Sequence, residues 1–211
     1  MNHTLSQPLH ILRLDSSPRY SDSLSRHLTD RLMARLLREY PEATATTRDL
    51  AVGVPLPTEE LTGGIVYSAH NPTPAMQAAT QLSDELVAEL LAADLVVLGL
   101  PVYNWTVPST FKAYVDQVVR PGVTFDYIDG VRHGKLRARR VYIVFTSGGT
   151  GLGSDQDFAT PYAQFLWQTL GIQHVEFIEA AGLLFNAAES TRQAEAQVDQ
   201  LELPVFSLGQ K

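Results

Sequence analysis

A continuous apolar stretch in the middle of the chain, Leu95 to Leu100, constrains the fold more than any other feature. A short run of Val and Leu without polar interruption predicts a strand buried on both faces, as in mostly parallel sheets. Pro101 follows the run and ends the strand. The next residues then emerge at the carboxyl end of the strand, where open α/β sheets bind ligands. We therefore expect functional side chains directly after Leu100.

Strand and helix patterns alternate along the rest of the chain. The predicted strands are Leu9–Leu14, Thr44–Leu50, Leu95–Leu100, Arg140–Thr146 and His174–Glu179. Apolar residues at helical spacing lie between and after them, over 24–37, 76–90, 109–119, 162–170 and 189–201. Because right-handed crossovers place helices on both faces of a parallel sheet, the pattern predicts an α/β doubly wound fold. We expect one domain, 1–211, with a five-stranded sheet of order 2-1-3-4-5.

Two segments interrupt the alternation. Ala51 to Pro74 is rich in Pro and Gly, and we interpret it as a long functional loop and a candidate lid. Residues 122–134 contain a strand-like run followed by Asp129-Gly130, a hairpin signal. We predict a small excursion from the sheet, in which Phe125 and Tyr127 are candidates for an aromatic wall of a substrate pocket.

Three unusual loops follow the first, third and fourth predicted strands. The first, 15–23, is crowded with hydroxyls before a helix, which suits either a phosphate or a simple helix cap by Ser21 or Ser23. The second presents Tyr103, Asn104 and Trp105, which are either a platform for a flat ligand or ordinary core residues. The third, 147–154, is glycine-rich but lacks the G-x-G-x-x-G spacing of dinucleotide sites.

Composition excludes several classes of function. The net charge of -7 and the pI near 5.3 give no basic surface for nucleic acid. The chain has no cysteine, so disulfides, thiol catalysis and thiolate metal sites are absent, and we predict no metal. No apolar run approaches membrane-spanning length, and the amino terminus lacks a signal-peptide pattern. We expect a soluble cytoplasmic protein without a membrane partner.

The order 2-1-3-4-5 brings the three loops to one edge of the sheet. Hydroxyls and helix amides suit a phosphate, an aromatic such as Trp105 suits a flat ring, and glycines allow backbone contact with ring heteroatoms. Together these features predict a site for flavin mononucleotide (FMN), which requires no metal.

Four motifs resemble the FMN-dependent NADH-azoreductase family, also called NADH:quinone reductases: Leu-Pro-Val-Tyr-Asn-Trp at 100–105, Arg-Pro-Gly-Val-Thr-Phe at 120–125, Thr-Ser-Gly-Gly at 146–149 and Thr-Pro-Tyr at 160–162. The resemblance implies a flavodoxin-like flavoprotein that forms a homodimer with FMN where the subunits meet. It also implies two-electron, ping-pong hydride transfer through flavin N5, from NADH or NADPH to quinones and azo compounds.

The same resemblance implies the cofactor-binding residues. The phosphate would lie near Ser17 and a Ser-Gln-Ser triplet that is Ser21-Asp22-Ser23 here, so Asp22 departs from the family pattern. Where some members carry an Arg after the serine of the third loop, this chain has Gly148. Contacts to the ring would come from Pro101, Val102, Tyr103, Asn104, Trp105, Ser147, Gly148, Gly149 and Thr150. No catalytic side chain is required, because the cofactor carries the chemistry and protons can come from solvent.

Two other functions fit parts of the sequence. A flavodoxin-type electron-transfer protein shares the predicted fold and the acidic charge, although 51–74 and 122–134 exceed what an electron carrier needs. A hydrolase with Ser147 as nucleophile has less support, because no G-x-S-x-G motif surrounds this serine.

Overall fold

The central sheet has five parallel strands in the predicted order. The computed structural model describes residues 3–5, 8–67 and 72–208. Its sheet has the order β3-β2-β4-β7-β8, which is 2-1-3-4-5 when the five strands are counted along the chain. The predicted fold class is therefore confirmed. The strands are β2 (His10–Asp15), β3 (Thr44–Asp49), β4 (Leu95–Pro101), β7 (Arg140–Thr146) and β8 (His174–Ala180).

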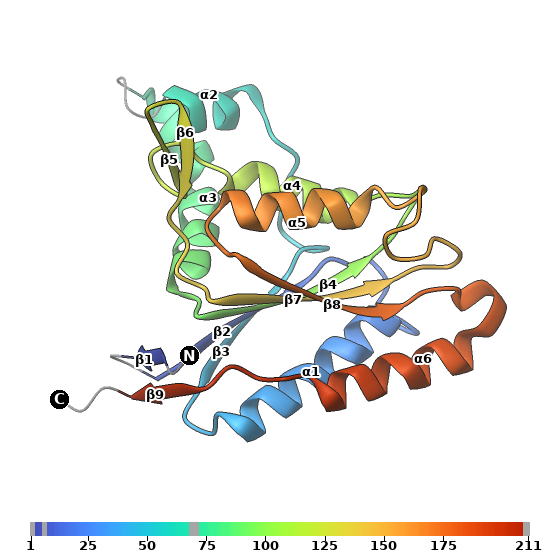
Figure 1. Cartoon of the computed structure of the whole chain (residues 1–211). Helices are drawn as coiled ribbons and strands as arrows, with labels where there is room; N and C mark the ends of the chain where they lie inside the picture. The colour runs from blue at the N-terminus through green and yellow to red at the C-terminus, as the bar shows by residue number, and fades with distance from the viewer. Residues whose placement is uncertain (1–2, 6–7, 68–71, 209–211) are drawn as a thin grey trace.

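Helices cover both faces of this sheet (Figure 1). α1 (Leu24–Glu39) and α6 (Leu183–Gln200) lie on one face, and α3 (Pro74–Ala92), α4 (Ser109–Val118) and α5 (Ala159–Thr169) lie on the other. Every residue of β4 is buried, as the uninterrupted apolar run predicts. Its side chains alternate between the two cores: Val96 and Leu98 pack toward α3, α4 and α5, and Leu95 and Val97 pack toward α1 and α6.

The segment 51–74 is not the irregular loop that its composition predicts. It contains the helix α2 (Glu59–Tyr67), so that prediction was wrong for these residues; residues 68–71 lie outside the described part of the chain. The Thr58 hydroxyl accepts a hydrogen bond from the Leu61 amide (3.2 Å) and starts the helix. Leu61 and Ile65 are buried, and Gly63 and Gly64 allow close packing against α3. The two glycines that suggested a loop instead permit helix packing.

The predicted excursion is an antiparallel hairpin of β5 (Phe125–Ile128) and β6 (Val131–Gly134). Asp129 and Gly130 both have positive φ (52° and 77°), so the predicted turn is confirmed. Gly134 lies so close to the Leu170 backbone that a Cβ would be 2.0 Å from its carbonyl carbon. The hairpin is therefore packed tightly against the end of α5.

The ends of the chain contain elements that the sequence patterns did not indicate. β1 (His3–Leu5) pairs in parallel with β9 (Phe206–Leu208), outside the central sheet. The last helix begins at Leu183 rather than at the predicted Glu189. Asn186 has non-helical dihedral angles inside α6, so a kink separates its first turn from the more regular part that was predicted.

Candidate functional site

A pocket of about 270 Å³ opens at the carboxyl ends of β2, β4 and β7. All three predicted loops contribute to it. The predicted site residues that line it are Ser17, Asp22, Ser23, Pro101, Val102, Tyr103, Ser147 and Gly148. The structure adds lining residues that we did not predict to bind the cofactor: Arg19, Leu24, Ser25, Thr146, Leu183 and Leu184. Predicted residues that do not line it are Ser21, Asn104, Trp105, Gly149, Thr150, Phe125 and Tyr127.

The first wall of the pocket is the start of α1. Ser23 is the N-cap residue, and its side chain makes no capping hydrogen bond. The first turn of a helix has amides without intrahelical acceptors, and this first turn contains no acidic residue. The buried hydroxyl of Ser25 lies 3.3 Å from that of Ser23. This wall is suited to an anion, and its serine pair is Ser23 and Ser25.

Asp22 leads the chain into this helix in a left-handed conformation, with φ of 58°. Aspartate tolerates this region better than most residues, which gives the departure from the Ser-Gln-Ser triplet a local backbone role. Arg19 lines the same pocket and supplies a positive charge on the loop that carries Asp22.

The second wall is a tight turn after β4. The amide of Tyr103 donates to the Thr106 carbonyl (3.1 Å), and the amide of Thr106 donates to the Tyr103 carbonyl (3.3 Å). Asn104 and Trp105 form the tip, both with positive φ. Trp105 is 56% exposed and its carbonyl accepts from Phe158, whereas the Tyr103 hydroxyl lies 3.3 Å from that of Ser17. Tyr103 is therefore the aromatic residue of the pocket, and it joins the first two loops.

The third wall is the loop after β7, which the start of α6 holds in place. The carbonyls of Ser147 and Gly148 accept hydrogen bonds from the amides of Leu183 (3.1 Å) and Leu184 (3.0 Å). A Cβ at Gly148 would lie 3.1 Å from Leu184 Cδ1, so a larger residue there requires Leu184 to shift. The Ser147 hydroxyl donates to the Thr150 carbonyl. A nucleophilic serine needs a base as its acceptor, so this geometry does not support the hydrolase alternative.

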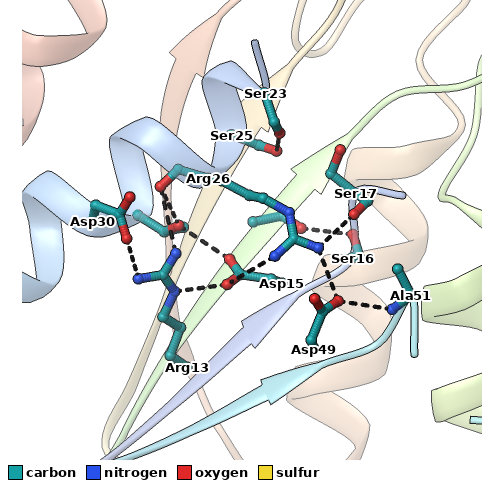
Figure 2. Close-up of polar contacts among 12 residues, drawn as sticks. Arg13, Asp15, Ser16, Ser17, Ser23, Ser25, Arg26, Asp30, Asp49 and Ala51 are labelled. Atoms are coloured by element: carbon teal, nitrogen blue, oxygen red, sulfur yellow. Dashed lines mark hydrogen bonds and ion pairs between the residues drawn. The ribbon is translucent and has the colours of Figure 1, made fainter. Parts of the chain in front are cut away.

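Charged side chains form a network behind the first loop (Figure 2). Asp15 is 3% exposed and contacts Arg13 Nε (2.9 Å), Arg26 Nη1 (3.5 Å) and the Thr29 hydroxyl (3.1 Å). Asp49 accepts from Arg26 Nη2 (2.8 Å) and from the Ala51 amide (3.0 Å). Burial alone would raise the pKa of Asp49, but these hydrogen bonds outweigh burial and hold its pKa below the usual value.

Comparison with known protein families agrees with this architecture. A family described by its flavodoxin-like fold matches residues 9–202. The chain belongs to this family. Two relatives of the chain are called FMN-dependent NADH:quinone oxidoreductase 1. The protein from Jannaschia sp. (strain CCS1) is 40% identical over 192 residues, covering 91% of this chain and 98% of the relative. The protein from Hahella chejuensis (strain KCTC 2396) is 37% identical over 195 residues, covering 92% and 96%.

Solved structures share the same flavodoxin-like fold. An azoreductase from Bacillus anthracis str. Sterne superimposes with a TM-score of 0.81 at 20% identity, covering 91% of this chain and 96% of that one. An FMN-dependent NADH-azoreductase from Bacillus anthracis str. Ames Ancestor, in complex with FMN, gives a TM-score of 0.81 at 22% identity, with coverage of 90% and 96%.

The structure also bears on metal sites and membrane spans. Among residues 3–5, 8–67 and 72–208, no three His, Asp or Glu side chains gather in a way that could hold a metal ion. Within the same part of the chain, no helix combines the length and the apolar character needed to cross a membrane.

Proposed function

We propose that the protein is an FMN-dependent NADH:quinone oxidoreductase with azoreductase activity. The observation that carries the proposal is that the loops after β2, β4 and β7 all contribute to one pocket. The names of relatives at 40% and 37% identity over nearly the whole chain support the same activity. In the flavodoxin-like arrangement, this edge of the sheet is where a ligand binds.

The residues of the pocket fit FMN part by part. The hydroxyls of Ser17, Ser23 and Ser25, with the amides at the start of α1, would hold the phosphate. Val102 and Tyr103 would contact the isoalloxazine ring, and the backbone of Ser147 and Gly148 would contact its polar edge. This assignment depends on the lack of a capping hydrogen bond from the Ser23 side chain, because such a bond would already occupy an amide of the first turn of α1.

Bound FMN would supply the redox chemistry, taking a hydride from NADH and delivering two electrons to a quinone or an azo compound. The chain itself binds and orients the ring. The hydroxyls of Ser17 and Tyr103 are hydrogen-bonded to each other, and the Ser147 hydroxyl donates to the Thr150 carbonyl. These bonds hold the three side chains in the positions from which they would orient the ring. We assign no side chain as a catalytic acid or base, and protons are taken from solvent.

We also propose a homodimer in which a second copy completes the pocket. Leu184 and Phe185 are 80% and 83% exposed at the start of α6, and Leu184 lines the pocket. Exposed apolar residues at the edge of a pocket mark an interaction surface.

Several expectations stay predictions from the sequence. They are a cytoplasmic location, a single domain spanning 1–211, and the absence of nucleic-acid and membrane partners. The assignment of Phe125 and Tyr127 to a substrate pocket also stays a prediction. Phe125 is buried, its ring packs edge-on against Tyr127 at 5.4 Å, and neither lines the pocket described above.

Steady-state oxidation of NADH by benzoquinone or by an azo dye, with FMN and no partner protein added, tests the function. We expect turnover that depends on both FMN and the acceptor. Protein that binds FMN but shows no turnover would instead be a flavodoxin-type electron carrier. Protein that binds no flavin would refute the proposal.

A further inference from the structure

We propose that Arg26 is a positioning residue that makes the pocket selective for the phosphorylated flavin. It turns the carbonyls of the first loop away from the phosphate site and neutralises the carboxylates behind that loop. This inference rests on the proposed function, because it concerns how the same pocket recognises FMN.

Arg26 holds two carbonyls of the loop that leads into α1. Its Nη2 donates to the Ser17 carbonyl (2.7 Å) and its Nε donates to the Arg19 carbonyl (3.0 Å), as Figure 2 shows for Ser17. A carbonyl oxygen that faced a phosphate dianion would repel it. The peptide between Ser17 and Pro18 has no N–H that could donate to the phosphate, because proline lacks this donor. Arg26 also holds the carbonyl of the peptide between Arg19 and Tyr20. Because a trans peptide is planar, the Tyr20 N–H of that peptide points in the opposite direction to this carbonyl.

Arg26 also balances the carboxylates behind the loop. The same guanidinium contacts Asp49 Oδ1 at 2.8 Å and Asp15 Oδ2 at 3.5 Å. Both aspartates lie at the carboxyl ends of their strands, at the edge where the phosphate would bind. Without Arg26, the carboxylate of Asp49 would keep its hydrogen bonds from the Ala51 amide and the Tyr20 side chain, but it would lose its contact with the guanidinium and would contribute repulsion to an anion in the pocket.

The position of Arg26 couples these contacts to the helix start. Arg26 lies in the first turn of α1, directly after Ser25, and its side chain is only 15% exposed. Its guanidinium carbon lies 4.5 Å from the centre of the Tyr20 ring. A guanidinium can bind several acceptors at fixed angles, whereas a lysine ammonium is a compact point charge. We therefore expect lysine to retain the charge but not the loop geometry.

The test measures dissociation constants for FMN and for riboflavin, which lacks the phosphate, by quenching of flavin fluorescence. We expect Arg26→Gln to raise the FMN constant at least about tenfold, the equivalent of losing one charge-assisted interaction. The dissociation constant for riboflavin should change less than about threefold, which is well below the roughly tenfold change that the loss of one interaction would cause. Arg26→Lys should fall between the wild type and Arg26→Gln. Arg31→Gln is the matched control, because Arg31 lies on the same helix but bonds Asp199 (3.0 Å).

The ratio of the two constants decides the outcome. If Arg26→Gln leaves the ratio of the FMN and riboflavin dissociation constants unchanged, because both affinities fall equally or neither falls, the inference is overturned. If the wild type binds neither flavin, the proposed function fails, which is a different result. The double variant Arg26→Gln/Asp49→Asn guards against misfolding. It should recover part of the FMN affinity because the unpaired carboxylate is gone, and no recovery in folded protein would contradict the charge argument.

Discussion

Replacing Gly99 with valine should push α1 away from β4 and weaken FMN binding. A Cβ at Gly99 would lie 3.3 Å from Thr29 Cγ2, 3.5 Å from Asp15 Oδ1 and 3.7 Å from Ser25 Cβ. An alanine therefore needs a shift of only a few tenths of an ångström. Valine adds two methyl groups in the same closed space, and overpacking of this kind costs about 1–3 kcal/mol. For a chain of this length, that corresponds to a fall in Tm of about 2–12 °C.

The assay compares Tm by circular dichroism without ligand, and FMN and riboflavin affinities, for Gly99→Val and Gly99→Ala. Gly151→Ala is the control, because the nearest atom to its added Cβ would be 4.0 Å away. We expect Gly99→Val to lose stability and to lose FMN affinity more than riboflavin affinity, since the displaced element carries the phosphate-binding amides. A Gly99→Val protein as stable as Gly99→Ala, with unchanged FMN affinity, would show that packing around Gly99 does not set the position of α1.

Variants at four other positions test the pocket, the hairpin packing, the charge network and the dimer. Ser25→Ala should weaken FMN binding at least about tenfold and Ser21→Ala should not, because only Ser25 lines the pocket; equal effects in a fluorescence titration would contradict the assignment. Gly134→Ala should lower the free energy of unfolding in urea by at least about 3 kcal/mol, since its Cβ would lie 2.0 Å from the Leu170 backbone; an unfolding midpoint like that of Gly151→Ala would contradict this packing. As pH falls below about 4, unfolded Asp49 takes up a proton before the folded form does, so wild type should lose more stability than Asp49→Asn; parallel curves in urea denaturation between pH 5 and 3 would exclude this contribution. Phe185→Asp should shift the protein from dimer to monomer in light scattering, and an unchanged mass would remove this residue from the interface.

The sequence predicted the sheet because its strands are encoded locally. Arg140–Thr146 has the same bounds in the structure as in the prediction, and β4 extends the predicted strand only by Pro101. Leu95–Leu100 is an uninterrupted apolar run, and residues 141–145 are aliphatic or aromatic; burial of both segments on two faces leaves little choice of structure. The Asp129-Gly130 turn was likewise predictable, because few residue pairs accept two consecutive positive φ values.

The details of the pocket depend on features that the sequence does not encode locally. Serines at 21, 23 and 25 form two overlapping Ser-x-Ser pairs, and only the observed helix start at Leu24 selects Ser23 and Ser25. Leu183 and Leu184 were missed because the kink at Asn186 separates them from the periodic part of α6. The contacts of Arg26 involve Asp15 and Asp49, whose proximity depends on the pairing of β2 with β3. Short β1 and β9 are strands only because they pair with each other.

We expect the FMN phosphate to bind where α1 begins, between Ser17, Ser23 and Ser25. The most direct test is a crystal structure of the protein with FMN. We expect phosphate oxygens within hydrogen-bond distance of the first-turn amides of α1, with the ring against Tyr103. Flavin density at any other place, or crystals that exclude FMN at saturating concentration, would contradict it.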